Sequence, residues 1–379
     1  MRISKKKKIK VVLAVTNDIA TDARVHKTAC TLLQSNYDVT VVGRKLKTSQ
    51  KTLERPYKTK RFLHIFNKNM FFYAEYNIRL FLYLLFSKFD IYTANDLDTL
   101  PAVFIASRIR RRPIIYDSHE YFTEVPELQN NTFGKKVWTI LEKNIVPKIK
   151  FASTVCPSIA KEYKNMYNVH FEVIRNVPLS IKNNNTAHIH TQAYILYQGA
   201  LNMGRGIELM IEAMQYIDDY KLYIAGSGPV EQDLKQLTQT LNLTNKVLFL
   251  GRLDFTALRE ITKGACLGLS LEENIGKNYY YALPNKLFDY IQNHIPVLVS
   301  DFPEMKNIVN NYNVGDILIS TERTPKQLAE KIKILCKNIE LINKWKENCR
   351  LAAQELCWEN EQKKVIELYS RAIKSKHIR

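Results

Sequence analysis

Long apolar runs are absent from this sequence. The stretch "LFLYLLF" at residues 80–86 is far shorter than the ~20 residues that a membrane-spanning helix needs. Near the N-terminus, "IKVVLAVTND" follows a basic run at Lys5–Lys8, but its apolar part is too short for a signal-peptide core. We therefore expect a cytoplasmic protein that is neither secreted nor integral to a membrane.

Local cysteine pairs and glycine fingerprints are lacking too. The six cysteines are scattered without a Cys-x-x-Cys pair, which is typical of reduced, mostly buried thiols. No local Cys/His cluster occurs that could form a structural zinc site. The G-x-G-x-x-G motif of dinucleotide-binding sites is also missing. These absences argue against a disulfide-stabilised protein and against a zinc module.

Positive charge, by contrast, is abundant and unevenly spread. The net charge is +19, with 32 Lys and Arg against 15 Asp and Glu in residues 1–185 and 24 against 22 in residues 186–379. A strongly basic half beside a nearly neutral one indicates that the basic half faces a polyanionic partner.

The length of 379 residues predicts two domains. Short β-rich runs alternate with amphipathic helical patterns, which predicts an α/β protein with parallel sheets and crossover helices. The pattern restarts after a polar linker at 180–191. We predict two Rossmann-like, doubly wound domains at residues 1–182 and 190–357, followed by a helical tail at 358–379. Ligands of such sheets bind beyond the carboxyl ends of the strands, in the cleft between the halves.

The expected elements are as follows. Strands are predicted near residues 9–15, 38–43, 90–94, 113–117, 152–156, 171–175, 193–198, 221–225, 246–250, 266–271 and 296–300. Helices are predicted near residues 22–35, 71–87, 99–110, 134–148, 158–166, 205–217, 230–241, 254–264, 285–293 and 325–338.

Two cations stand at predicted helix starts. In "PNKLFDY", Lys286 lies in the first turn of a helix, where the helix macrodipole disfavours positive charge. Arg205 opens another predicted helix, after a glycine-containing loop that follows a strand of the same sheet. One such residue would be an ordinary surface side chain, but two favour a shared anion such as a diphosphate.

Several motifs, in register along the chain, resemble one family. They are "NDIATDARVHK", "ANDLDTLPA" and "YDSHEYFTEVPEL" in the first half, and Gly199–Gly206, "AGSGP" and "PNKLFDYIQNHIPVLVSDFPE" in the second. Over nearly its whole length the chain resembles retaining glycosyltransferases of the GT-B fold, family four. The resemblance implies two Rossmann-like domains facing a central cleft, with the acceptor held by the N-terminal domain and a UDP- or GDP-linked sugar by the C-terminal one. It also implies that no metal takes part, and that the last helix packs back on the N-terminal domain.

Carried over residue by residue, the resemblance assigns three roles. Arg205 resembles the basic residue that neutralises the donor diphosphate. His119 resembles the active-site histidine beside the transferred sugar. Asp289 stands where the family has the second of two glutamates, which binds the ribose hydroxyls.

The sequence also departs from the family pattern. The first of the two glutamates is replaced by Tyr281, and we expect Glu272 or Glu273 to reach the donor sugar instead. The glycine-rich first loop is absent from "TNDIATDAR", where Asn17 is expected to substitute through side-chain hydrogen bonds.

A second basic residue is usual after the first glycine of the "YQGAL" loop. Here Ala200 follows Gly199. We expect Lys286 to compensate, and we assign Gly199, Asn285 and Lys286 to the donor site together.

Two further patterns have alternative interpretations. The "DLD" at residues 96–98 resembles the metal-binding Asp-x-Asp of the other glycosyltransferase fold, but Asp98 is expected to cap the following helix. His119 and Glu120 could form an acid/base pair, although neighbours in sequence need not face the same way.

Aromatic residues are dense between residues 62 and 92, with Lys68, Arg79 and Lys88 interleaved. Part of this segment is expected to be a buried crossover helix. Aromatic density on a basic domain also fits a face that lies on an anionic membrane surface, where a polyprenyl-linked acceptor would be found.

These features predict a peripheral membrane glycosyltransferase that moves a sugar from a nucleotide-diphosphate donor to a glycan or lipid-linked acceptor with retention, in cell-surface polysaccharide biosynthesis. One alternative is a nucleotide-sugar 2-epimerase of the same fold, which would need extra carboxylates and no acceptor surface. Another is a basic nucleic-acid-binding protein. The lack of a recognised nucleic-acid module in the sequence argues against this alternative. We expect no nucleic-acid partner and no cofactor besides the donor.

Overall fold

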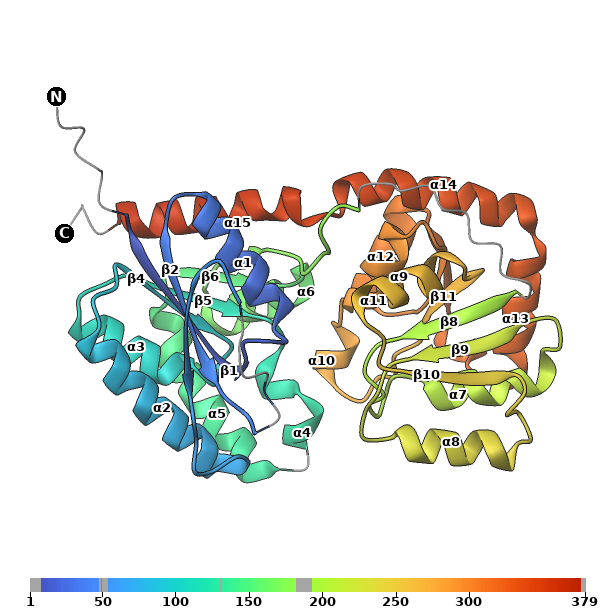
Figure 1. Cartoon of the computed structure of the whole chain (residues 1–379), viewed down its shortest axis with the longest axis horizontal. Coiled ribbons are helices and arrows are strands. Elements are labelled where there is room, and N and C mark those ends of the chain that lie inside the picture. The colour runs from blue at the N-terminus through green and yellow to red at the C-terminus, as the bar shows by residue number, and fades with distance from the viewer. Residues whose placement is uncertain (1–7, 48, 50–53, 130, 182–192, 376–379) are drawn as a thin grey trace. The chain divides into compact units, whose positions relative to one another are not determined.

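In the computed structural model, the chain forms two compact units (Figure 1). The structure describes residues 8–47, 49, 54–129, 131–181 and 193–375. The first unit comprises Met1–Asn176 and Asn360–Arg379, and the second comprises Val177–Glu359. Most of the predicted linker and the start of the basic N-terminal run lie outside the described residues.

The first unit is built on a seven-stranded sheet in the order β3-β2-β1-β4-β5-β6-β7, and all its strand pairs are parallel. Its strands are β1 (Lys10–Asp18), β2 (Asp38–Arg44), β3 (Lys58–Phe62), β4 (Ile91–Asn95), β5 (Ile114–Ser118), β6 (Phe151–Thr154) and β7 (Glu172–Val173). Its helices are α1 (Ala23–Gln34), α2 (Asn69–Phe86), α3 (Leu100–Ile109), α4 (Pro126–Gln129), α5 (Thr132–Ile145) and α6 (Pro157–Tyr167), with short 3₁₀ turns at Phe122–Glu124 and Val146–Lys148.

The second unit has a six-stranded sheet in the order β10-β9-β8-β11-β12-β13, which is parallel throughout. Its strands are β8 (Tyr194–Gln198), β9 (Lys221–Ala225), β10 (Val247–Gly251), β11 (Leu267–Ser270), β12 (Val297–Ser300) and β13 (Gly315–Leu318). Its helices are α7 (Ile207–Ala213), α8 (Glu231–Thr240), α9 (Phe255–Lys263), α10 (Lys277–Tyr280), α11 (Asn285–Gln292), α12 (Pro303–Tyr312), α13 (Pro325–Lys337) and α14 (Ile339–Glu355), with 3₁₀ turns at Met214–Tyr216 and Ser320–Glu322.

Sequence and burial explain why both sheets are parallel. In β1, the run from Val11 to Val15 is buried without interruption, as expected for a strand covered by helices on both faces. Asp22 starts the first crossover helix, α1, because its side chain accepts a hydrogen bond from the backbone N–H of Val25 at 3.0 Å. The predicted α/β class with two doubly wound sheets is confirmed.

A buried tyrosine joins helix α11 to the sheet of the second unit. The hydroxyl of Tyr290 donates to the backbone oxygen of Leu196 at 3.0 Å and accepts from the N–H of Gln198 at 3.1 Å. Gly268 makes room for the ring, since a Cβ there would lie 2.5 Å from it. Helix α11 carries Asn285, Lys286 and Asp289, so this contact positions the residues expected to bind the donor.

The last helix, α15 (Trp358–Lys374), leaves the second unit and belongs to the first from Asn360 onward. Tyr369 on α15 shares a 2.8 Å hydrogen bond with Thr93 on β4. Both residues are buried, so the C-terminal segment is part of the core of the first unit.

Apart from short 3₁₀ turns, six elements were not among the sequence expectations: β3, α4, α10, α12, β13 and α14. The first, "KTKRF", is a charged edge strand whose side chains are exposed or half-buried, and so it lacks the apolar pattern of an inner strand. Helix α14 presents small and mixed residues, such as Cys349 and Ala352, to the core, which weakens its apolar periodicity. None of the helices in the described part of the chain is long and apolar enough to cross a membrane.

Candidate active site

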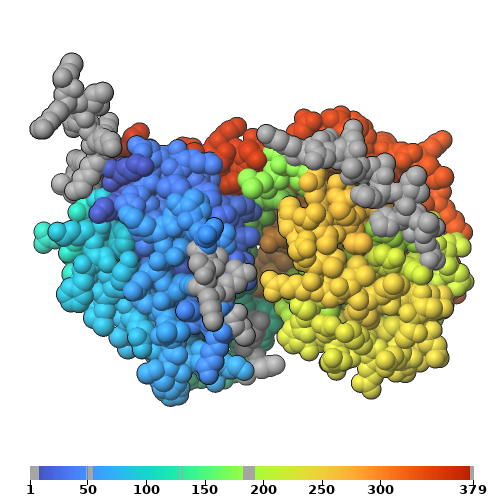
Figure 2. Space-filling view, viewed as in Figure 1, coloured from blue at the N-terminus to red at the C-terminus, as the bar shows by residue number. Residues whose placement is uncertain are grey.

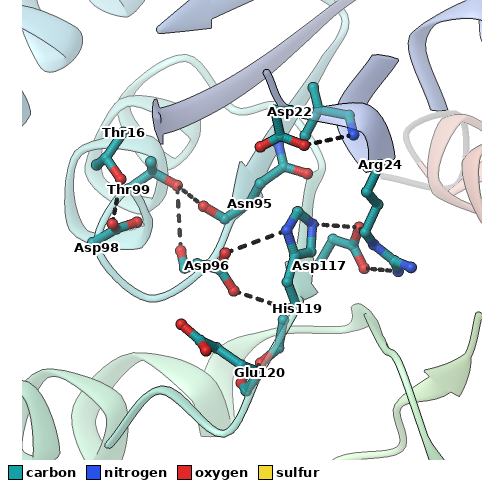
Figure 3. Close-up of polar contacts among 12 residues, drawn as sticks. Thr16, Asp22, Arg24, Asn95, Asp96, Asp98, Thr99, Asp117, His119 and Glu120 are labelled. Atoms are coloured by element: carbon teal, nitrogen blue, oxygen red, sulfur yellow. Dashed lines mark hydrogen bonds and ion pairs between the residues drawn. The ribbon is translucent and has the colours of Figure 1, made fainter. Parts of the chain in front are cut away.

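Polar side chains of the first unit gather at the carboxyl ends of β4 and β5. His119 follows β5, and its ring is held by two carboxylates (Figure 3). Its Nε2 is 3.1 Å from Asp117 and its Nδ1 is 3.3 Å from Asp96. The backbone N–H of His119 also donates to Asp96 at 2.7 Å. Both nitrogens of the imidazole therefore face acids.

Asp117, the deeper of the two acids, has further donors. Arg24 on α1 binds it with two nitrogens, at 3.1 and 2.8 Å, and Ser153 on β6 donates to it at 2.7 Å. Arg24 is itself 4% exposed, and a bidentate guanidinium–carboxylate pair is among the stronger polar contacts in proteins.

The charges of this network follow from its geometry. Burial works to raise the pKa of Asp117, but Arg24 and His119 outweigh it and hold that pKa well below its usual range. Burial works to lower the pKa of His119, but Asp96 and Asp117 raise it to about 9. His119 is thus an imidazolium at neutral pH. It can donate hydrogen bonds and stabilise negative charge, but it cannot accept a proton.

The alternative acid/base pair of His119 with Glu120 does not fit this arrangement. Both imidazole nitrogens are engaged by Asp96 and Asp117, and the Glu120 side chain points away from the ring (Figure 3).

The prediction that Asp98 caps the following helix was wrong. The N-cap of α3 is Thr99, without a capping side-chain hydrogen bond. Asp98 instead accepts a hydrogen bond from Thr16 at the end of β1, because the β4–α3 loop turns its side chain back toward β1 (Figure 3). Asn17, the predicted substitute for the glycine-rich loop, is exposed beside Thr16, in the first unit rather than with the other predicted donor residues.

The second unit also has a buried acid beyond a strand end. Glu272, two residues after β11, is completely buried. One of its oxygens accepts from the Lys286 ammonium at 2.9 Å and lies 3.5 Å from Arg205, and the other accepts from Ser270 at 2.8 Å. Burial works to raise the pKa of Glu272, but Lys286 and Arg205 outweigh it and lower that pKa, so the acid is ionised.

Aromatic rings and glycines complete this cluster. The Lys286 ammonium lies 4.2 Å from the ring centre of Tyr197, and the Arg205 guanidinium lies 4.8 Å from that of Tyr279. Gly199 adjoins Lys286, since a Cβ there would be 3.5 Å from the lysine Cε. Gly206, the N-cap of α7, has a φ of 68°. The structure thus brings together Gly199, Arg205, Glu272 and Lys286.

The sequence-based explanation for Lys286 needs correction. Lys286 does lie in the first turn of α11, which starts at Asn285 with Pro284 as its N-cap. However, its position does not require an external anion, because Glu272 is a buried counter-ion within the same unit. Whether the lysine also contacts a phosphate is a separate question.

The remaining predicted residues have distinct settings. Glu273 is half-buried, and burial and Glu208 raise its pKa. Asp289 accepts a hydrogen bond from Gln198 at 3.3 Å, and Asn285 is exposed at the first position of α11.

Sequence reasoning missed Arg24, Asp96, Asp117 and Arg323. Arg323 donates to Ser300 at 2.8 Å and to the backbone of Leu271 at 2.9 Å, which brings a third cation near Glu272 and Glu273. Both acids stood in quoted motifs, Asp96 directly after β4 and Asp117 near the carboxyl end of β5, a signal that could have identified them. Among the described residues, no group of three or more His, Cys, Asp and Glu is arranged to hold a metal ion.

Comparisons with known proteins agree with this architecture. Sucrose-phosphate synthase from Thermosynechococcus elongatus superposes with a TM-score of 0.78 at 15% identity, covering 97% of this chain and 100% of that one. Anabaena HepE in complex with UDP-glucose gives 0.73 at 15% identity, covering 96% and 100%. The chain has the GT-B fold.

The sequence comparisons concern the second unit of this GT-B chain most directly. Residues 181–352 match the family model for glycosyl transferases group 1, so the chain carries a glycosyltransferase domain. A similar protein is an α-1,4-N-acetyl-D-galactosaminyltransferase of Campylobacter jejuni, whose name includes a glycan joined to PP-undecaprenol. It is 24% identical over 291 residues, which cover 71% of this chain and 76% of that one.

We predict that the His119 imidazolium titrates with a midpoint near pH 9. Its folded pKa is about 9, above the ~6.5 of a free imidazole. Its contribution to stability is therefore complete below about pH 6.5 and is lost as the pH rises through about 9. An NMR titration of the histidine ring measures the midpoint. Asp96→Asn should lower it, and a wild-type midpoint near that of a free imidazole would contradict the two ion pairs.

We predict that Lys286→Met destabilises the protein by about 3 kcal/mol, because it leaves the buried Glu272 carboxylate with only the more distant Arg205. The double variant Lys286→Met/Glu272→Gln should recover much of that loss. Lys306→Met, which removes a half-exposed partner of Asp301, should cost less than about 1 kcal/mol. Urea unfolding measures all four proteins. A Lys286→Met variant as stable as the wild type would show that the pair contributes nothing.

Proposed function

We propose that this protein transfers a sugar from a UDP- or GDP-linked donor to a glycan or lipid-linked acceptor, with retention of configuration and without a metal ion, in cell-surface polysaccharide biosynthesis at the cytoplasmic face of the membrane. The proposal includes membership of glycosyltransferase family four. One observation carries it: Arg205 and Lys286 share Glu272, close to Gly199 and Gly206 with their positive φ angles, within the domain that matches glycosyl transferases group 1.

The two cations suit a diphosphate leaving group. Negative charge develops on the nucleoside diphosphate as its bond to the sugar breaks, and fixed cations stabilise that charge. Arg205 is partly exposed, with 24% of its side chain accessible, so it can contact a ligand. Lys286 is more buried, with 7% accessible, and shares the Glu272 carboxylate with Arg205. Asp289, held by Gln198, offers a carboxylate to the ribose hydroxyls.

The burial and pairing of Glu272 are compatible with retention of configuration without a covalent intermediate. A double displacement would need an accessible carboxylate nucleophile, but Glu272 is buried and paired with Lys286. Attack by the acceptor on the face that the diphosphate leaves needs no such group. In the first unit, the His119 imidazolium supplies a positive charge and hydrogen-bond donors but no base.

The names of the similar proteins support the two substrate classes. The Campylobacter jejuni enzyme is named for an undecaprenol-linked glycan, and HepE was solved with UDP-glucose. A lipid-linked acceptor would bring the protein to a membrane surface.

Helix α2 has a face that suits such a surface. Phe72, Tyr76, Leu80 and Leu84 are buried, which confirms that part of the aromatic segment is core. The opposite side leaves large apolar side chains exposed, by 47% to 82% of their surface, at Met70, Phe71, Ile78, Leu82 and Phe86. Helix α2 runs along the outside of the first unit next to α3 (Figures 1 and 2).

Nucleotide binding tests the donor site. Arg205→Ala should weaken binding of UDP or GDP, whichever the wild type binds, roughly ten- to hundredfold, because a charge-assisted hydrogen bond contributes about 1.5–3 kcal/mol. Calorimetric titration gives the affinity. Arg350→Ala, which removes an exposed arginine paired with Glu347 on α14, is the matched control and should bind normally. Unchanged affinity in Arg205→Ala would exclude the proposed diphosphate contact.

Vesicle sedimentation tests the membrane face. The wild type should bind vesicles that contain anionic lipid better than neutral ones, and release at high salt, because basic residues near such a surface add about 1 kcal/mol each. Phe71→Glu/Phe86→Glu should lower binding at least about tenfold by removing apolar insertion. The control variant Ile334→Glu, which changes an exposed apolar residue on α13, should leave vesicle binding unchanged. Equal binding to both vesicle types would refute the membrane partner.

A further inference from the structure

The first unit contains a cavity that adjoins the His119 network through Asp96 and also includes Asn17 in its lining. It has a volume of about 510 Å³ and opens where β1, the β4–α3 loop and the start of α2 meet. Its lining comes from these segments and from other residues of the first unit: Asp22, Arg44, Glu120, Phe122, Val125, Leu128 and Trp138. A space of this size suits a small polar ligand such as one sugar ring.

One wall of the cavity is acidic, although this unit is the basic half of the chain. Asp22, Asp96, Asp98 and Glu120 all line it. Asp98 is 6% exposed, and one of its oxygens accepts the hydrogen bond from Thr16. Its other oxygen, Oδ1, is buried and has no hydrogen-bond partner in the described part of the chain. A buried polar atom without a partner is costly to a folded protein unless something else satisfies it.

The protonation of Asp98 suits a hydroxyl ligand. Burial and the neighbouring Asp96 raise the pKa of Asp98 to about 8. Near neutral pH the carboxyl group is therefore mostly protonated, and it offers one donor as well as acceptors. Sugar hydroxyls, which donate and accept at the same time, match that pattern.

The lining also contains aromatic rings and a second unsatisfied group. Trp138 packs edge-on against Tyr73 and Phe122, with ring centres 5.2 and 5.3 Å apart. The Arg44 guanidinium lies 4.8 Å from the ring centre of Phe72, and its buried Nε has no hydrogen-bond partner among the described residues. A pyranose presents a C–H face to aromatic rings and hydroxyls to polar groups, and the cavity offers both surfaces.

We propose that this cavity binds the terminal sugar of the acceptor, and that Asp98 determines its specificity by exchanging hydrogen bonds with the sugar hydroxyls. The assignment of the sugar to the acceptor rests on the proposed function. The choice of a sugar as the ligand rests only on the lining of the cavity within the first unit.

Tryptophan fluorescence can detect the sugar, because Trp138 lines the cavity. The full-length protein is titrated with the methyl glycosides of glucose, galactose, N-acetylglucosamine and N-acetylgalactosamine, up to about 50 mM, since single sugars bind weakly. At least one should give a saturable change, which Trp138→Phe abolishes. Asp98→Ala should weaken binding at least about tenfold, whereas Asp98→Asn, which keeps a donor and an acceptor, should stay within about threefold of the wild type.

Titration of the same variants with UDP and GDP separates this inference from the proposed function. Unchanged nucleotide affinity in Asp98→Ala, together with lost glycoside binding, supports an acceptor cavity. A wild type that binds a nucleotide but none of the four glycosides overturns the cavity assignment and leaves the proposed function standing. Glycoside binding that survives in Asp98→Ala overturns the role of Asp98. Loss of nucleotide-sugar affinity in Asp98→Ala, with glycoside binding unchanged, would place the donor sugar there and also overturn the assignment.

Discussion

A carboxylate can be buried at the end of a strand only if cations are buried with it, because the cost of removing a lone charge from water is several kcal/mol. Both units obey this constraint in the same way. Asp117 lies near the carboxyl end of β5 and is compensated by Arg24 and the His119 imidazolium. Glu272 follows β11 and is compensated by Lys286, with Arg205 close by. In each case, segments distant in sequence converge on one acid, so the loops at the carboxyl ends of the strands are held in place by charge as well as by packing. Polar groups fixed in this way lose little freedom when a ligand arrives.

The same constraint decides what these residues can do chemically. The imidazole of His119 has both nitrogens engaged by carboxylates, so near neutral pH it is a fixed positive charge rather than a proton carrier. Lys286 and Arg205 are partly neutralised by Glu272, which lowers their attraction for weak anions. One carboxylate offsets only one of the two positive charges, so the pair keeps a net positive charge that would attract the diphosphate proposed above. A buried acid such as Glu272, placed beside the binding cations, thus favours anions of higher charge over singly charged ones.

Patterns that repeat along the chain were predictable from sequence, and contacts between distant residues were not. The two sheets follow from apolar runs such as Val11–Val15, whose continuity reflects burial on both faces. The edge strand β3 has no such run, because its side chains face solvent. Lys286 was identifiable because it breaks a local rule in the first turn of α11. Arg205 was singled out in the same way, but the prediction that it opens a helix was wrong, because α7 begins at Ile207 after the N-cap Gly206. Their partner Glu272 was assigned to the donor sugar instead, since nothing in the sequence shows that position 272 folds under position 286. Asp98 looked like a helix cap for the same reason: its bond to Thr16 spans 82 positions.

The contact between Tyr290 and Gly268 has a consequence for how this fold can change over time. A side chain at position 268 would collide with the aromatic ring, and without the ring the buried backbone groups of Leu196 and Gln198 lose a partner. The two positions are therefore expected to vary together among related chains. Where both have changed, α11 must sit at a different height on the sheet, and the ammonium of Lys286 moves with it. Substitutions more than 20 positions away from one another would then shift a residue of the proposed donor site without touching it.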